Sequence, residues 1–257
     1  MTMTPANVTM LTFAPMINSE CCRFVLTHYG IPFDEQRHIF GAVSVIAYLR
    51  NGDVHIPLIQ GDGGLSVIGP QPVVDHYDPQ ADAARKLMPS DPAQKAQTML
   101  LFQRYNGDLG AETAVIGYDY LLPHKDIMIG PFTEGLPMIE AELTNISYPL
   151  LEVLFDSLLH LSPERVAQAL TTTRAIFAET DKLIADGRQY LVGSQLSLAD
   201  IALATAAGPL ILPPYYGSPM PAFDVMPVEL KAIITELRAT ATGKFVVQLY
   251  EKHRCGG

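Results

Sequence analysis

Asn18 and Ser19 are the residues whose types and position best suit chemistry. The apolar, β-forming run that begins at Val8 stops at Pro15, and an amphipathic segment follows it directly. This order predicts a strand, a turn and a helix that starts beside Asn18 and Ser19. Free backbone N–H groups and the dipole of such a helix favour an anion, so the pattern suits a thiolate or a carboxylate. The alternative is that Asn18 or Ser19 only caps the helix.

A β-hairpin is predicted further along the chain. Two apolar runs, His55–Ile59 and Leu65–Ile68, flank the turn sequence Gly61-Asp62-Gly63-Gly64. Pro57, at the head of its strand, suits a sheet edge or a special backbone site. A helix over Pro70–Tyr77 follows, because prolines in a first helical turn lack only N–H groups that would stay unbonded.

Apolar spacing predicts the remaining elements. Before the hairpin we expect a helix that ends at Gly30, an extended segment over 33–39 and a helix over 40–50. Residues 78–92 carry three prolines among polar residues, which indicates a linker between two domains. After this linker we expect only helices, over residues 93–114, 143–161, 164–186, 198–212 and 228–254.

Two proline-rich segments of the helical part, 118–137 and 209–227, are expected to be irregular. Long loops inside a compact domain are often functional. The second segment holds several aromatic and apolar residues, so it is a candidate wall for a hydrophobic substrate site. The alternative is that it is only a packed connection.

Ser197 and Asp200 have the spacing of a capping box. Ser197 precedes an apolar helical run, and Asp200 stands three residues later. Such a pair satisfies two backbone N–H groups at a helix start, and Leu196 can pack on Ile201 as a hydrophobic staple. The pattern predicts a helix start in the core of the helical part.

These patterns together resemble cytosolic glutathione transferases. The N-terminal order of strand, helix with Arg23 and Gly30-Ile31-Pro32-Phe33, second strand, Asn51–Pro57 and hairpin resembles the thioredoxin-like half, and Tyr190–Ala202 resembles the motif of the helical half. The resemblance implies an α/β thioredoxin-like domain over residues 1–80, a linker over 81–92 and an all-α substrate domain over 93–257. It also implies that the Ile56-Pro57 peptide is cis.

The resemblance implies a glutathione S-transferase-like enzyme that adds or exchanges glutathione, its cosubstrate, at a hydrophobic electrophile. The family's catalytic Ser, Tyr or Cys position falls on Met16, which cannot donate a hydrogen bond, so Ser19 and Asn18 are the candidates that orient the thiolate. Glutathione is expected to bind at His55, Ile56, Pro57 and Gly69. Relatives are typically dimers, so we expect a homodimer.

One departure keeps other functions open. Gly69-Pro70 stands where the family has the Glu-Ser pair that holds the γ-glutamyl end of glutathione. Gly69 still offers a backbone N–H, but Pro70 does not. The alternatives are a protein of this fold that has lost glutathione and binds a small molecule or acts as a scaffold, or an enzyme that does not use glutathione.

Composition excludes several classes of partner. The 257 residues, 48% of them hydrophobic, suffice for one large or two modest domains. A net charge of −10 argues against nucleic acids and anionic membranes as partners. The longest apolar stretch, Ile201–Tyr216, is too short and too rich in proline for a membrane span. Residues 1–7 lack the basic and apolar regions of a signal peptide.

Cysteine and histidine usage excludes further chemistry. Three cysteines, two of them adjacent at Cys21 and Cys22 and the third at Cys255, form no disulfide framework, which favours a reducing cytoplasm. Adjacent cysteines inside a helix are usually buried apolar residues, with a redox pair as the less common alternative. The seven histidines show no metal-ligand spacing, so we expect no metal.

Overall fold

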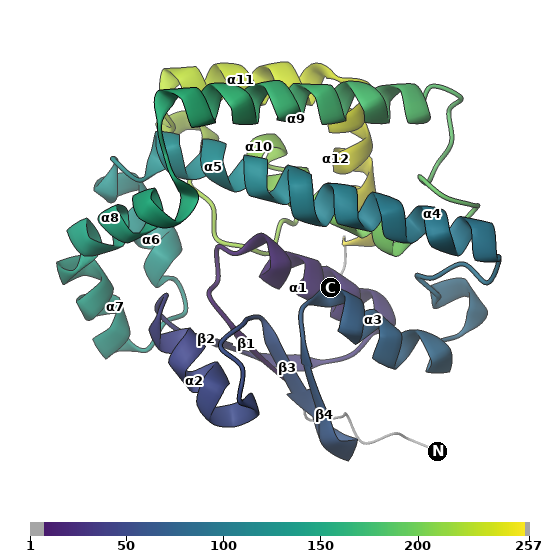
Figure 1. Cartoon of the computed structure of the whole chain (residues 1–257), viewed down its shortest axis with the longest axis horizontal. Coiled ribbons are helices and arrows are strands. Elements are labelled where there is room, and N and C mark those ends of the chain that lie inside the picture. Colours follow the sequence, from purple (N-terminus) through teal and green to yellow (C-terminus); the bar gives the residue numbers. More distant parts are fainter. Residues whose placement is uncertain (1–7, 255–257) are drawn as a thin grey trace.

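A four-stranded mixed sheet forms the N-terminal part of the protein in this computed structural model, which describes residues 8–254 (Figure 1). The strands are β1 (Val8–Thr12), β2 (Phe33–Arg37), β3 (Leu58–Gly61) and β4 (Leu65–Ile68), and their order in the sheet is β2-β1-β3-β4. β1 is parallel to β2 and antiparallel to β3, and β3 is antiparallel to β4. The expectations for residues 1–7 and for Cys255 lie outside the described part.

Three helices complete this part: α1 (Ile17–Tyr29), α2 (Ala42–Asn51) and α3 (Pro70–Tyr77). Gly30 ends α1 with a φ of +69° and donates its N–H to the carbonyl of Thr27 at 2.9 Å. The left-handed conformation at this position favours glycine, as the sequence predicted. α1 and α3 pack together, and α1 lies between the sheet and the helical part of the chain (Figure 1).

The rest of the chain is helical. α4 (Pro92–Phe102), a π-helical segment (Gln103–Leu109) and α5 (Gly110–Leu121) form one long rod (Figure 1). The other helices are α6 (Lys125–Thr133), α7 (Met138–Ile146), α8 (Tyr148–Leu159), α9 (Pro163–Leu183), α10 (Leu198–Ile211), α11 (Val228–Ala239) and α12 (Ala241–His253). Among the described helices, none is long and apolar enough to span a bilayer.

α10 is the centre of the helical part. Every one of its residues except Pro209 is buried, and it contacts α1, α4, α5, α11 and α12. A helix that is apolar on all sides is stable only when neighbours cover all of it. Its contact with α1 joins the sheet to the helices and thereby fixes where the start of α1 lies.

The capping box at the start of α10 is confirmed. The Asp200 carboxylate accepts hydrogen bonds from the N–H of Ser197 at 2.9 Å and from its hydroxyl at 2.6 Å. It also accepts from the N–H of Leu191 at 2.7 Å. Burial raises the pKa of Asp200 to about 6, against the lowering effect of these hydrogen bonds. The motif therefore holds the preceding loop as well as the helix.

The predicted fold class, an α/β domain followed by an all-α domain, is confirmed. The hairpin of β3 and β4 and the cis Ile56-Pro57 peptide are also confirmed. Residues 78–91 contain two short 3₁₀ turns and are tied down at Asp78, which accepts from the N–H of Leu87 at 2.6 Å and the hydroxyl of Tyr29 at 2.9 Å.

Three predicted elements were wrong. The segment 118–137 is not irregular, because α5 continues to Leu121 and α6 forms despite Pro131, with Met128 and Phe132 buried. The predicted helix over 143–161 is two helices, α7 and α8, since Pro149 lacks the N–H needed inside a helix and stands in a new first turn.

The predicted helix over 228–254 is also two helices. Thr240 is extended and caps α12 by accepting the N–H of Gly243 at 2.9 Å. A Cβ on Gly243 would lie 2.2 Å from the carbonyl oxygen of Leu237, so only glycine permits this close turn between α11 and α12.

Candidate functional site

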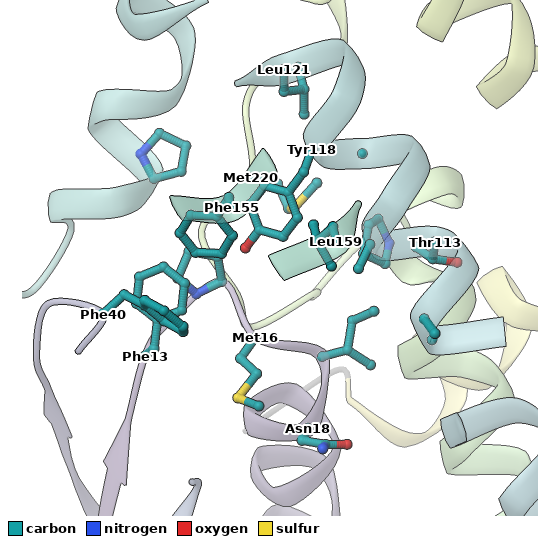
Figure 2. Close-up of a pocket in the computed structure, with 18 of the residues that line it drawn as sticks. Phe13, Met16, Asn18, Phe40, Thr113, Tyr118, Leu121, Phe155, Leu159 and Met220 are labelled. Atoms are coloured by element: carbon teal, nitrogen blue, oxygen red, sulfur yellow. The ribbon is translucent and has the colours of Figure 1, made fainter. Parts of the chain in front are cut away.

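A cavity of about 390 Å³ lies where the start of α1 meets the helical part (Figure 2). Its walls come from the loop after β1, the start of α1, the loop before α2, the π-helical segment, α5, α6, α8 and the segment 209–221. The lining residues are Phe13, Pro15, Met16, Ile17, Asn18, Phe40, Asn106, Gly107, Gly110, Ala111, Thr113, Ala114, Gly117, Tyr118, Leu121, Met128, Pro131, Phe155, Leu158, Leu159, Pro209, Pro219, Met220 and Pro221. Most are apolar, so the cavity suits an apolar ligand.

Aromatic rings form one side of this cavity. Phe13 packs edge-on against Phe40 with 5.4 Å between ring centroids, and Phe40 lies 4.9 Å from Phe155. Tyr118 stacks on Phe155 at 4.7 Å. These rings come from the loop after β1, the loop before α2, α5 and α8, so tertiary packing alone brings them together (Figure 2).

The start of α1 forms one end of the cavity. Met16 is the N-cap and its side chain makes no capping hydrogen bond, while its carbonyl accepts the N–H groups of Ser19 at 3.0 Å and Glu20 at 3.2 Å. Within residues 8–254, the N–H groups of Ile17 and Asn18 and the Asn18 carboxamide form no hydrogen bond. Free donors at a helix N-terminus attract an anion.

Ser19 and Asn18, which the sequence grouped together, lie in different environments. Asn18 lines the cavity. The Ser19 side chain is fully buried, does not line the cavity, and donates its hydroxyl to the carbonyl of Phe13 at 3.2 Å. Ser19 thus holds the loop between β1 and α1, and Asn18 is the side chain that reaches the ligand space.

The four residues expected to bind glutathione do not line this cavity. Leu58 pairs with Leu11, so Ile56-Pro57 lies alongside the end of β1, next to the loop that leads to α1. The main-chain N–H and C=O groups of Ile56 form no hydrogen bond with any described residue. They are therefore free to pair with an extended ligand.

Gly69 and His55 are less available to a ligand than Ile56, because both already have hydrogen-bond partners. The N–H of Gly69 donates to the carbonyl of Pro57 at 3.0 Å. His55 is exposed, and its ring Nδ1 lies 2.5 Å from the Asp53 carboxylate. Hydrogen bonds from the backbone and side chain of His55 lower the pKa of Asp53.

A buried ionic cluster around Arg23 in α1 was not predicted as part of the site. Arg23 is 3% exposed and uses both ends of its guanidinium group for Glu35, with N–O distances of 3.0 and 2.6 Å. It also donates to Glu20 at 3.2 Å, to the Ser218 hydroxyl at 2.7 Å and to the carbonyl of Ala14 at 3.1 Å. All five N–H donors of Arg23 are used.

This cluster positions the segment 209–221 against the start of α1. Glu20 is fully buried and accepts the N–H of Gly217 at 3.0 Å and the hydroxyl of Tyr250 at 3.1 Å. Ser218 donates to the carbonyl of Ala14 at 3.0 Å. These hydrogen bonds hold Gly217 and Ser218, the two residues that precede Pro219. They therefore fix the cavity wall formed by Pro219 to Pro221. The sequence contained only a weak signal for this role, two acidic residues and an arginine in apolar surroundings.

Two further cavity residues escaped the sequence interpretation. Tyr118 lies in a segment that was expected to be irregular, and Asn106 lies in the π-helical segment. The Oδ1 atom of Asn106 is buried and has no partner among the described residues. π-helical turns often occur at functional sites because they turn side chains out of the regular helical face. Local apolar spacing carries no signal for such a turn.

The two described cysteines lie in the protein core. Cys21 and Cys22 are fully buried, and burial raises the pKa of the Cys21 thiol to about 12. No group of three or more potential metal ligands occurs among residues 8–254.

A family model described as the glutathione S-transferase C-terminal domain matches residues 163–228. This region contains Ser197 and Asp200, the pair that caps α10. The sequence matches no curated protein sequence.

Solved structures share the fold over nearly the whole chain. The β-etherase LigF from Sphingobium sp. strain SYK-6 has a TM-score of 0.58 and 17% identity, covering 94% of this chain and 99% of LigF. A glutathione S-transferase from Xanthobacter autotrophicus Py2 has a TM-score of 0.57 and 13% identity, covering 96% and 93%. A glutathione-bound transferase from Methylobacillus flagellatus KT has a TM-score of 0.55 and 16% identity, covering 93% and 98%. The chain therefore shares the fold of these glutathione S-transferases over nearly its whole length, and its residues 163–228 match the C-terminal domain of the family.

Proposed function

We propose that the protein is a glutathione-dependent transferase that joins the glutathione sulfur to an apolar electrophile in the cavity. The observation that supports this most is the start of α1, where the N–H groups of Ile17 and Asn18 and the Asn18 side chain have no partner within residues 8–254. These donors stand at the end of an apolar space, so an anionic sulfur there would face its electrophile directly.

The physical role of Asn18 in this proposal is to stabilise the thiolate. A free thiol has a pKa of about 8.5, so little thiolate exists at neutral pH unless donors or a helix N-terminus lower that pKa. The Asn18 carboxamide offers two N–H donors, and Met16 offers none. Asn18 takes the role that a hydroxyl or thiol has elsewhere in the family, and Ser19 supports the loop.

The cysteinyl part of glutathione would pair with Ile56. The N–H and C=O groups of Ile56 are free within the described residues, and the cis Ile56-Pro57 peptide lies beside the loop between β1 and α1. A transferase of the same fold, from Methylobacillus flagellatus KT, was solved with glutathione bound, which supports glutathione as the cosubstrate.

The test is turnover and binding with Asn18→Ala, with Asn145→Ala as the matched control. Asn145 is exposed on α7 and outside the cavity. We expect Asn18→Ala to lower turnover of a generic electrophile by about 10²-fold, the loss typical of one donor to a developing anion, and to weaken glutathione binding less. Asn145→Ala should match the wild type. Equal turnover of the two variants would remove Asn18 from the mechanism.

The start of α3 favours a second candidate function. In this function, a protein of this fold binds a small molecule without glutathione. The α3 N-cap Gly69 already donates its N–H to Pro57, and Pro70 and Pro72 carry no N–H. The first turn of α3 therefore offers few donors for a γ-glutamyl carboxylate. Calorimetric titration separates the two functions: glutathione binding supports the transferase, and binding of apolar ligands alone supports the second candidate.

A further inference from the structure

α7 presents an apolar side to solvent. Its exposed apolar residues are Met138, Ile139, Leu143 and Ile146, which are 52% to 78% exposed. Ile139, Leu143 and Ile146 are spaced by four and three residues, so they share one face of the helix. The residue of α7 that is buried is Thr144. α7 is therefore amphipathic in the opposite sense to an ordinary surface helix.

Hydrogen bonds hold the inward side of α7. The Glu140 carboxylate accepts the N–H of Ile39 at 2.8 Å and lies 2.7 Å from Nδ1 of His38, two residues that stand between β2 and α2. The hydroxyl of Thr144 donates to the carbonyl of Glu140 at 2.7 Å. These contacts fix which side of α7 faces the protein, so its apolar side stays available to another molecule.

α8 extends this apolar side. Its exposed apolar residues are Leu150, Val153, Leu154 and Leu158. The three leucines follow one another at intervals of four residues and therefore share a face. α7 and α8 pack together, only Ser147 separates them, and Figure 1 shows both at one end of the molecule. We call the eight exposed residues the α7–α8 surface. An exposed apolar surface formed by this many large side chains marks an interaction site.

The charges around the α7–α8 surface are acidic. Residues 126–164 contain seven Asp or Glu residues and no Lys or Arg. Glu142 is exposed and lies among the apolar residues of α7, three residues after Ile139 and four before Ile146. Glu152 and Asp156 follow one edge of the exposed face of α8. None of these three carboxylates forms a salt bridge within residues 8–254.

We infer that the α7–α8 surface binds an amphipathic helix of a partner protein, with Lys or Arg beside its apolar face. The apolar residues of that helix would cover Leu143 and Leu150, and a basic residue would pair with Glu142. The inference goes beyond the proposed function and does not depend on it.

Two other occupants fit this surface less well. A second copy of the chain would bring two acidic surfaces together, and like charges across an interface oppose binding. A lipid surface would remove water from the Glu142 carboxylate without supplying a counter-charge. A basic helix covers the apolar residues and neutralises the carboxylates at the same time.

The test uses two fluorescent model peptides of about 14 residues, or four helical turns. Both carry leucine on one helical face, and the other face carries lysine in one peptide and glutamate in the other. Fluorescence anisotropy measures their binding to the full-length protein. We expect the Leu/Lys peptide to bind at least about tenfold more tightly than the Leu/Glu peptide. Equal affinities, or no binding of the Leu/Lys peptide, would overturn the inference.

Surface variants show where the Leu/Lys peptide binds. Val153→Gln and Glu142→Lys change exposed residues of the α7–α8 surface and should each weaken binding about tenfold. Val228→Gln and Glu229→Lys are the matched controls, because Val228 and Glu229 are exposed on α11, and binding should stay within about twofold. Equal effects of the two pairs would mean that the peptide binds elsewhere, and the inference would fail.

Two further measurements detect the other occupants. A second copy on this surface would appear in sedimentation velocity as self-association that Val153→Gln abolishes. A lipid surface would appear as binding of the wild type, but not of Val153→Gln, to phosphatidylcholine vesicles. Either result would replace the partner helix and overturn the inference.

Discussion

Replacing Arg23 with methionine should destabilise the protein more than any single surface change. The variant removes five hydrogen bonds and leaves the Glu20 and Glu35 carboxylates without the guanidinium group that pairs with both of them. Removing one partner of a buried ion pair typically costs about 3–5 kcal/mol, because the remaining charge is uncompensated. For a chain of this size that corresponds to a drop in Tm of about 10 °C.

Differential scanning calorimetry at neutral pH measures this effect, with Arg104→Met as the control. Arg104 pairs with Asp108 and Glu179 at 2.9 Å, but these groups are exposed, so its loss should cost at most about 1 kcal/mol. Adding Glu35→Gln to Arg23→Met should recover part of the loss by removing an unpaired charge. Equal Tm values for the Arg23→Met and Arg104→Met variants would refute the account of the cluster.

The same cluster predicts a pH dependence. Burial raises the pKa of Glu35, but the hydrogen bond and charge of Arg23 outweigh it, so the pKa is lowered overall. A carboxylate with a lowered folded-state pKa stabilises the protein above its unfolded pKa, and this stabilisation is lost as the pH falls through the folded value. The Tm difference between wild type and Arg23→Met should therefore shrink below about pH 4.

Two further predictions concern the domain boundary and the cap of α10. Trypsin should cut first within residues 78–92, after Arg85 or Lys86, since this segment joins the sheet to the helices; first cuts within residues 8–68 would show that the boundary is misplaced. Asp200→Ala should lower the free energy of unfolding by about 3 kcal/mol, because the buried N–H groups of Ser197 and Leu191 lose their acceptor. An unchanged Tm would mean that these hydrogen bonds contribute nothing.

Local patterns predicted the elements that surround the site but not which side chains face the cavity. Gly30 and the Asp200 cap were predictable because each depends on a short stretch of sequence, whereas the cis Ile56-Pro57 peptide was implied by the family resemblance. Asn18 and Ser19 were not distinguishable in this way. Consecutive helical residues point about 100° apart, so only one of them faces the cavity, and the packing of α1 on α10 decides which.

The aromatic and ionic contacts depend on distant segments and therefore leave no local signal. Arg23 meets Ser218 from the other end of the chain, and Phe13 meets Phe155. The segment 209–221 was predicted as a candidate wall because it is apolar and rich in proline, and it does line the cavity. Its attachment to α1 through Glu20 could not be read from spacing.

The central claim, that the start of α1 stabilises the glutathione thiolate, is tested most directly by the pKa of the bound thiol. Ultraviolet absorbance of the thiolate, followed against pH in the complex, gives this value for the wild type, Asn18→Ala and Asn145→Ala. We predict a bound-thiol pKa well below the usual value of about 8.5 in the wild type and in Asn145→Ala, and a higher one in Asn18→Ala. A bound thiol that titrates as in free solution, or no binding at millimolar glutathione, would contradict the account.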